Sequence, residues 1–173
     1  MADAGCQWVL LGHWEARRHF GETDDLVNRK LHRTLEAGLR PILLVGESKG
    51  ERDRFDKALL ARLPRLLAEC DAGQVGGMSF VYEPEWSIGM TEPAPPKHVA
   101  AGCRLIRQWL ARTYGHPTAQ TVRIIYGGSV RPQYGRALLE AADMDGLGAS
   151  RKGRQVESFA QIVRLIAAAK GVE

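Results

Sequence analysis

Short apolar runs alternate along the chain with longer segments in which apolar residues recur at helical spacing. The apolar runs predict strands at 7–12, 41–47, 78–84 and 121–129, with a weaker fifth at 143–149. The segments that follow them predict helices at 23–39, 50–72, 96–115, 132–142 and 157–171, with a kink expected at Pro64. Five β-α units therefore follow one another at a period of roughly 35 residues.

The predicted strands are continuously apolar rather than alternating, which is typical of a parallel sheet covered on both faces. The fold class is therefore α/β. In such sheets the functional groups gather where the strands end. The five strand ends deliver Gly12 to Glu15, Gly46-Glu47, Glu83 to Glu85, Tyr126 to Ser129, and Gly148 to Arg151. One histidine, several carboxylates and two turns of small residues are thus expected on one rim, as in an active site.

Composition narrows the class of protein further. The 173 residues, 45% hydrophobic and 25% charged, suit a single domain over 1–173 with its own core. The net charge of +4 suits a small anionic ligand, and the absence of charge runs argues against nucleic acid. No apolar run reaches the roughly 18 residues of a membrane span, and the first residues do not resemble a secretion signal. Cys6, Cys70 and Cys103 lack metal-binding spacing and read as free thiols, so a cytoplasmic location is expected.

The stretch VYEPEWSIGM, residues 81–90, contains the strongest candidate for a catalytic group. Glu83 ends a strand and precedes Trp86 and Ile88, whose apolar side chains would raise its pKa and make it a general base. The alternative is an ordinary turn carboxylate, a description that fits Glu85 better. His13 is a candidate for polarising a carbonyl, or else a histidine that caps the next turn.

Other polar residues have simpler interpretations. YGGSV, residues 126–130, can cradle a phosphate with backbone N–H groups and the Ser129 hydroxyl, although such turns are also common structural breaks. Glu22 and Glu47 are expected to anchor loops, and residues 17–19 to form a solvated or ion-paired face. Residues 86–94, with Gly89 and flanking prolines, suit either a hinged lid or a passive loop.

Several segments resemble the triosephosphate isomerase family. They are WVLLGHWEARRHFGETDDLVNRK, VYEPEWSIG and RIIYGGSVRPQ, with a looser match in DGLGASRKGRQVESFAQIV. The resemblance implies a (β/α)₈ barrel, of which this chain would supply about five units, corresponding to strands 4–8. It also implies isomerisation of dihydroxyacetone phosphate to glyceraldehyde 3-phosphate, in glycolysis and gluconeogenesis, without a cofactor or metal.

The resemblance assigns roles to individual residues. Glu83 matches the base, His13 the electrophile and Glu15 a supporting carboxylate. Gly89, Gly128, Ser129, Ser150 and Arg151 match the phosphate-binding positions. Tyr126 matches the residue that latches the lid. The lid itself comprises Trp86, Ser87, Ile88, Gly89, Met90, Thr91, Glu92, Pro93 and Ala94.

The chain also departs from the family pattern. Trp14 stands where a small serine is expected beside the electrophile, where an indole could block the pocket, and Ala16 replaces the first of two arginines. The lid reads SIGMTEPAP, and Ser150-Arg151 replace Gly-Gly or Gly-Arg. The catalytic lysine and its neighbouring asparagine belong to units before those present here. We therefore expect a fragment, a split gene product or a start codon wrongly assigned at Met1. Its exposed sheet edges would favour self-association or a homo-oligomer.

Two alternative functions follow from these departures. A four-carbon (tetrulose) phosphate would keep the mechanism and change the substrate. A non-catalytic remnant would bind phosphate without turnover, because the lysine is missing.

Overall fold

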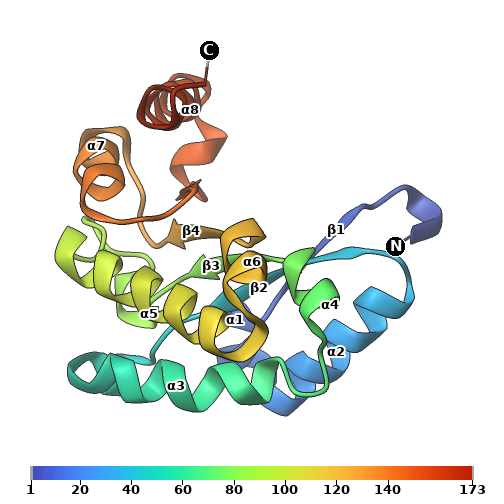
Figure 1. Cartoon of the computed structure of the whole chain (residues 1–173). Helices are drawn as coiled ribbons and strands as arrows, with labels where there is room; N and C mark the ends of the chain where they lie inside the picture. The colour runs from blue at the N-terminus through green and yellow to red at the C-terminus, as the bar shows by residue number, and fades with distance from the viewer. Residues whose placement is uncertain (1, 173) are drawn as a thin grey trace.

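Five parallel strands form one sheet whose order follows the chain, β1-β2-β3-β4-β5, in the computed structural model, which describes residues 2–172 (Figure 1). The strands are β1 (Trp8–Leu11), β2 (Arg40–Val45), β3 (Ser79–Tyr82), β4 (Arg123–Gly127) and β5 (Gly146–Gly148). The predicted five-stranded α/β fold is confirmed. The sheet does not close into a barrel, and β1 and β5 form its two edges.

Eight α-helices and four 3₁₀ turns connect and flank the strands within residues 2–172. The helices are α1 (Trp14–Phe20), α2 (Asp24–Glu36), α3 (Phe55–Leu66), α4 (Ala72–Gly76), α5 (Pro96–Tyr114), α6 (His116–Thr121), α7 (Pro132–Ala141) and α8 (Val156–Lys170). The 3₁₀ turns are η1 (Ala2–Ala4), η2 (Lys49–Arg54), η3 (Glu85–Ser87) and η4 (Lys152–Arg154).

Three short helices, α1, α4 and α6, and a division within 50–72 were not predicted. Residues 50–72 contain η2, α3 and the start of α4, because Asp71 caps a new helix by accepting a hydrogen bond from the backbone N–H of Gln74 at 2.8 Å. Gly115, whose φ of 89° favours glycine, separates α5 from α6. Pro64 lies inside α3, which ends two residues later at Leu66.

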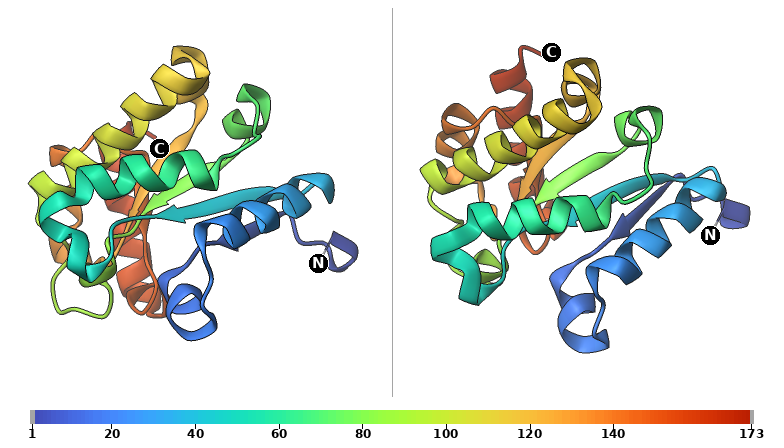
Figure 2. Two further views of the ribbon diagram at one scale, coloured as in Figure 1. Left: turned by 90° about the horizontal axis from the view of Figure 1, so that it is seen from below. Right: turned by 60° about the horizontal axis from the view of Figure 1, so that its bottom comes forward.

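The helices pack on one face of the sheet. Parallel neighbours in chain order, joined by crossovers of one hand, put every connecting helix on the same face. Contacts of α2, α3, α5 and α8 with the strands follow this arrangement, and the α1–α2 and α7–α8 pairs lie at opposite ends of the sheet (Figure 2). The core between these layers includes the fully buried side chains of Phe80, Tyr82, Ile124, Leu43 and Tyr126.

The face of the sheet away from the helices is only partly covered, which corrects the expectation that both faces are buried. Trp8 is 39% exposed and Leu10 is 55% exposed, whereas Leu11, which points to the other face of β1, is 6% exposed. No helix within residues 2–172 has the length and apolar character needed to span a bilayer.

The register brings the strand ends together. Val45 pairs with Tyr82, and Tyr82 pairs with Tyr126. The residues that follow, Gly46 and Glu83, therefore emerge side by side at the carboxyl edge of the sheet, next to Gly127 at the end of β4. This edge carries the candidate site.

Candidate active site

One hollow of about 370 Å³ at the carboxyl edge gathers every residue predicted for catalysis or phosphate binding. It is lined by His13, Glu15, Glu83, Ile88, Gly89, Gly128, Ser129, Ser150 and Arg151. These residues come from the ends of β1, β3, β4 and β5 and from the predicted lid. The structure thus brings the candidates together, while their individual roles stay predictions.

His13 is held by the first turn of α1. It occupies the N-cap position, and its Nδ1 accepts a hydrogen bond from the backbone N–H of Glu15 at 3.2 Å. A ring nitrogen that accepts carries no proton, so in the neutral imidazole the proton is on Nε2. Nε2 lies 3.7 Å from Oε2 of Glu83 and faces the hollow. His13 is therefore arranged as a donor beside the candidate base.

Glu83 is 8% exposed, and its Oε2 has no hydrogen-bond partner within residues 2–172. Burial raises its pKa; His13 opposes the shift and Glu15 adds to it, with the pKa raised overall. An unpartnered carboxylate with a raised pKa can take and return a proton near neutral pH.

Glu15 contributes through its backbone more directly than through its carboxylate. Its side chain is 73% exposed, with Oε2 at 4.0 Å from Nδ1 of His13. The predicted supporting carboxylate thus lies at the mouth of the hollow, while its N–H fixes the histidine ring.

Ser129 and Gly128 line the end of the hollow that is predicted to bind phosphate. Ser129 adopts φ 49°, a left-handed conformation that is unfavourable for a serine. Its Oγ is buried and has no hydrogen-bond partner among the described residues, so the hydroxyl is available to a ligand. Gly128 has φ 132°, and a Cβ there would lie 2.2 Å from Oγ of Ser87, so only glycine fits against the lid.

A second hollow, of about 280 Å³, adjoins this end and shares Ser129, Ser150 and Arg151 with the first. Its other lining residues include the basic side chains of Arg131, Lys152 and Arg154. These three residues were not among the predicted site residues, although the basic segment SRKGR, residues 150–154, follows closely after a predicted strand. A larger, more open hollow of about 670 Å³ between α7 and α8 contains none of the catalytic candidates.

The predicted lid is anchored at both ends and exposed between them. Nε1 of Trp86 donates to Oε1 of Glu47 at 2.7 Å, and the backbone N–H of Ala94 donates to the hydroxyl of Tyr126 at 2.8 Å. Between these anchors Met90 is 55% exposed, and Gly89 adopts φ 78°. This arrangement suits a loop that closes on the hollow, with Tyr126 at the predicted latching position.

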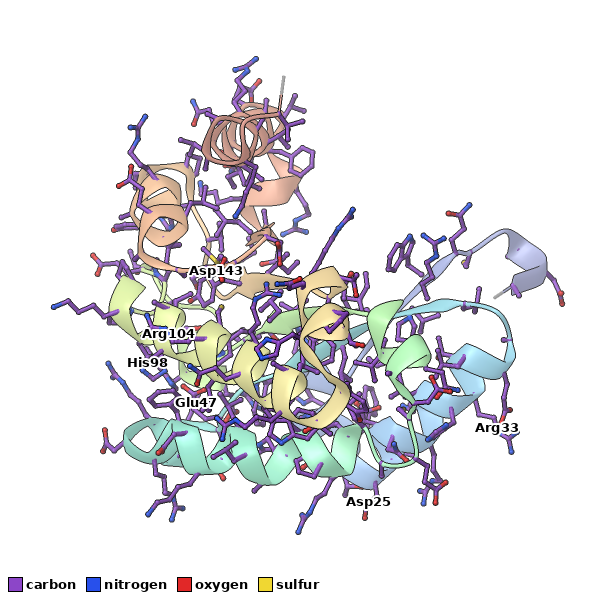
Figure 3. The ribbon with its side chains drawn as sticks, viewed as in Figure 1. Asp25, Arg33, Glu47, His98, Arg104 and Asp143 are labelled. Carbon is purple, nitrogen blue, oxygen red and sulfur yellow. The ribbon has the colours of Figure 1, made fainter. Side chains whose placement is uncertain are left out.

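Glu47 anchors loops as predicted, and it is fully buried. It accepts hydrogen bonds from Trp86 and from the Tyr82 hydroxyl, the latter at 3.0 Å. Nε2 of His98 lies 2.8 Å from Oε1 of Glu47 (Figure 3). His98 lies in the first turn of α5 and belongs to no motif, so no signal in the sequence pointed to this contact. Glu22, the other predicted anchor, pairs with Lys30.

Glu85 has a more important structural role than the sequence suggested. Its carboxylate accepts from Nη2 of Arg18 at 2.6 Å and from the backbone N–H of Lys49 at 2.9 Å. Burial tends to raise its pKa, but these donors outweigh burial and lower it overall. Glu85 is thus more than the ordinary turn carboxylate that the sequence suggested, because it ties the segment before the predicted lid to α1 and to the loop after β2. Arg17 and Arg18 are ion-paired, as expected.

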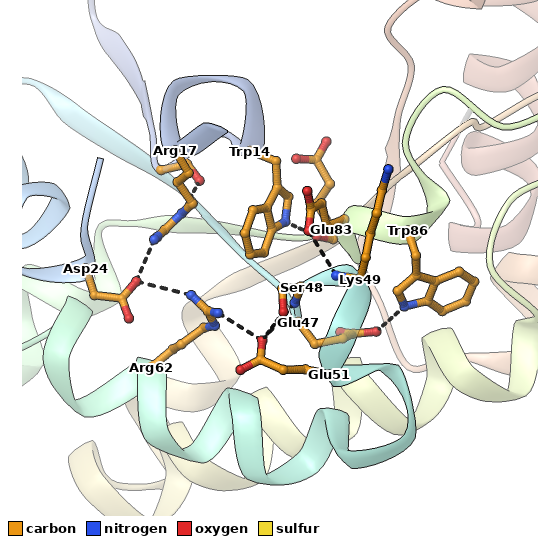
Figure 4. A network of polar contacts seen from close by, with 12 residues as sticks. Trp14, Arg17, Asp24, Glu47, Ser48, Lys49, Glu51, Arg62, Glu83 and Trp86 are labelled. Carbon is orange, nitrogen blue, oxygen red and sulfur yellow. Dashed lines mark hydrogen bonds and ion pairs between the residues drawn. The ribbon is translucent and has the colours of Figure 1, made fainter. Parts of the chain in front are cut away.

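Trp14 does not block the hollow, which corrects the expectation for this position. It is absent from the lining and instead lines a separate hollow of about 420 Å³ among α1, α2 and α3. Its indole N–H points to the backbone of Glu83 (Figure 4).

Metal-binding groups and disulfides are not evident in the part of the chain described. Residues 2–172 hold no cluster of three or more His, Cys, Asp or Glu side chains suited to a metal ion. Cys6, Cys70 and Cys103 are free thiols, as predicted.

The comparisons with known proteins agree on one family. The profile of the triosephosphate isomerase family matches residues 1–166. A triosephosphate isomerase of Chloroflexus aurantiacus is 41% identical over 165 residues, which is 94% of this chain and 66% of that protein. Those of Carboxydothermus hydrogenoformans and Herpetosiphon aurantiacus are 39% and 40% identical, each over 95% of this chain and 66% of the relative. The chain thus spans just under two thirds of the length of these relatives.

Proposed function

The chain belongs to the triosephosphate isomerase family, and we propose that its site interconverts dihydroxyacetone phosphate and glyceraldehyde 3-phosphate. The observation that carries this proposal is the pairing of a buried, unpartnered carboxylate with a histidine donor. Oε2 of Glu83 lies 3.7 Å from Nε2 of His13, beside a polar cradle in the same hollow.

The proposed chemistry moves one proton between neighbouring carbons. The Glu83 carboxylate removes a proton from C1 of the ketose, and the electrons of that C–H bond form the C1–C2 double bond of an enediolate. The Nε2–H of His13 donates to the C2 oxygen, where negative charge develops. The C1 hydroxyl then gives its proton to Nε2 of His13, which replaces the proton passed to the C2 oxygen. Glu83 returns its own proton to C2, and the C1 oxygen becomes the aldehyde. No atom is gained or lost, so no co-reactant is needed.

The phosphate end of the hollow supports a phosphorylated substrate. The Ser129 hydroxyl lacks a partner among residues 2–172, Gly128 lines the hollow without a side chain, and Arg151 supplies a positive charge. The lid, anchored by Glu47 and Tyr126, would exclude water from the enediolate, which otherwise loses phosphate.

A four-carbon phosphorylated ketose is the second candidate substrate. The observation in its favour is the basic hollow of about 280 Å³ that adjoins the phosphate end and offers additional room there. Trp14 no longer supports this alternative, because its side chain lies outside the substrate hollow.

A phosphate-binding protein without turnover is the third candidate. The lining of the hollow includes Arg151 but no lysine, whereas the family resemblance implies a catalytic lysine. This alternative predicts phosphate binding and no isomerisation.

The full 173-residue chain should be assayed with three- and four-carbon ketose phosphates, alongside direct measurement of phosphate binding. We expect turnover of the three-carbon substrate to fall at least roughly a thousandfold in Glu83→Gln, and to be unaffected in Glu140→Gln, which changes an exposed carboxylate on α7. Faster turnover of the four-carbon ketose would favour the second candidate. Phosphate binding without any turnover would favour the third.

We also infer that the chain associates with itself. Leu10 and Trp8 on β1 and an apolar face of α8 are exposed, and both ends of the sheet have unpaired edges.

A further inference from the structure

Trp14 holds the backbone of Glu83 from outside the substrate hollow. Its Nε1–H donates to the carbonyl oxygen of Glu83 at 2.9 Å, across 69 residues of sequence. This carbonyl lies where β3 ends and the lid begins. The contact therefore joins α1 to the base of the lid.

The indole ring is itself fixed by charged groups. The guanidinium carbons of Arg17 and Arg62 lie 5.5 Å and 5.2 Å from the ring centroid, within the range of cation–π attraction (Figure 4). Arg17 pairs with Asp24 at 2.6 Å, and Arg62 pairs with Glu51 at 2.9 Å. The ring thus rests on cations that are themselves held by carboxylates.

The surroundings of the Glu83 carbonyl leave little freedom. The backbone N–H of Glu83 donates to the carbonyl oxygen of Val45 at 2.9 Å. A Cβ on Gly46 would lie 2.1 Å from the backbone carbonyl oxygen of Glu83. The two neighbouring backbone segments therefore approach so closely that only glycine fits. The Trp14 hydrogen bond completes this fixation of the main chain.

The side chain of Glu83 has no comparable support. Its Oε2 has no hydrogen-bond partner among residues 2–172, so the place of that oxygen depends on the main chain and on packing. His13 immediately precedes Trp14 and caps the same helix. The adjacent residues His13 and Trp14 therefore have two effects. His13 places its ring at the hollow, and Trp14 holds the main chain of the residue that carries the carboxylate.

We propose that Trp14 is a positioning residue, whose indole N–H fixes the main chain of Glu83 and thereby sets the separation between the Glu83 carboxylate and His13. This inference rests on the proposed function for its catalytic consequence, but the positioning itself is a property of the unliganded protein. A tryptophan that only fills space would need its ring and not its N–H.

Trp14→Phe separates these two roles, because it keeps an aromatic ring between Arg17 and Arg62 and removes the donor. The matched control is Trp8→Phe on β1, where Arg40 lies 5.3 Å from the ring centroid; within residues 2–172 the indole that donates to the Glu83 carbonyl is that of Trp14. Both variants lose one indole, so a general effect of ring size appears in both.

The first readout is the pKa of Glu83. It is measured from the ¹³C chemical shift of the labelled Glu83 carboxyl carbon as a function of pH, in the full chain without substrate. Release of the main chain lets the carboxylate turn towards water, so Trp14→Phe should lower this pKa by about half a unit or more. Trp8→Phe should leave it unchanged. An unchanged pKa in Trp14→Phe, with a loss of thermal stability equal to that of the control, would overturn the inference.

The second readout needs no variant. The indole proton of Trp14 should exchange with solvent at least about tenfold more slowly than that of Trp8. Equal exchange rates would also contradict the proposal. If the wild-type chain isomerises the ketose phosphate, Trp14→Phe should lower kcat roughly tenfold and leave KM within about twofold of the wild-type value. If the chain shows no turnover, the proposed function fails, but the titration and the exchange rates still decide the role of Trp14.

Discussion

The indole N–H of Trp86 donates to the carboxylate of Glu47 at 2.7 Å and links the first residue of the predicted lid to the loop after β2. Glu47 is fully buried, and Tyr82 and His98 also lie within hydrogen-bond distance of its oxygens. A buried carboxylate of this kind depends on its donors, and they depend on it. The start of the predicted lid is thus held by a group that is not part of the lining of the hollow.

Replacing Glu47 by leucine should be strongly destabilising. The change leaves the buried Tyr82 hydroxyl and the half-buried Trp86 N–H without an acceptor, at a cost of about 3 kcal/mol in the free energy of unfolding. Glu47→Gln keeps one acceptor oxygen and should lose less. Urea unfolding measures both, and equal losses in the two variants would mean that shape, not hydrogen bonding, fixes this site.

Glu83 makes stability depend on pH. Burial raises its pKa, so between the ordinary and the raised values the folded protein holds a proton that the unfolded chain has released. Stability therefore falls as the pH rises through this window. Glu83→Gln removes the penalty, so at pH 8 its Tm should exceed that of the parent by a few degrees. The difference should vanish near pH 4.

Thermal melts across this pH range, with Glu140→Gln as the exposed control, test the expectation. A difference in Tm between Glu83→Gln and the parent that stays constant from pH 4 to pH 8 would show that ionisation of Glu83 is not responsible.

Ser129 should show opposite effects on stability and ligand binding. Ser129→Gly relieves the positive φ and should raise the free energy of unfolding by up to about 1 kcal/mol. It also removes the unpartnered hydroxyl, so phosphate should bind several-fold more weakly. Ser129→Ala keeps the backbone strain and loses the hydroxyl, so it should weaken binding without the gain in stability. Calorimetry of phosphate binding together with thermal melts distinguishes the two variants.

Tyr126 should control opening at the end of the lid. Tyr126→Phe removes the acceptor of the Ala94 N–H, and this buried amide should then exchange with solvent roughly tenfold faster. Hydrogen exchange followed by NMR measures the effect. Tyr114→Phe is the control, because its hydroxyl donates to the backbone carbonyl of Leu67 at 3.3 Å, outside the predicted lid. The same acceleration in both variants would argue against a latch.

The exposed face of α8 should mediate self-association. Val156, Phe159 and Val163 lie on one face of this helix and are 77%, 50% and 46% exposed. The double variant Phe159→Glu, Val163→Glu should sediment as a smaller species than the parent. Phe20→Glu, which changes an isolated phenylalanine that is 85% exposed, should have no such effect. A parent chain that is already monomeric would contradict the inference of association.

Periodicity and motifs predicted the strands, the five-unit order and the group of residues around the hollow, because each depends on local spacing and on the common edge of parallel strands. The remaining features, namely individual side-chain contacts and exposures, depend on tertiary packing and could not be predicted in this way. Trp14 could not be placed from its position beside His13, since the two neighbouring side chains diverge at the start of α1. The contribution of His98 was equally hidden, because its partner Glu47 lies 51 residues away. The exposure of Leu10 follows from the open sheet and not from its apolar surroundings in the sequence.

The order of the sheet has a consequence for how the molecule comes apart. Strand order follows chain order, so each strand pairs only with the units before and after it. Cooperativity is then transmitted from neighbour to neighbour, as in a stack of repeats, and not around a closed ring. β3, paired on both sides and rich in fully buried residues, is the centre of this stack. Unfolding should accordingly proceed inwards from the three-residue β5 and from β1, and the backbone under Glu83 should be the last part of the sheet to lose its protection.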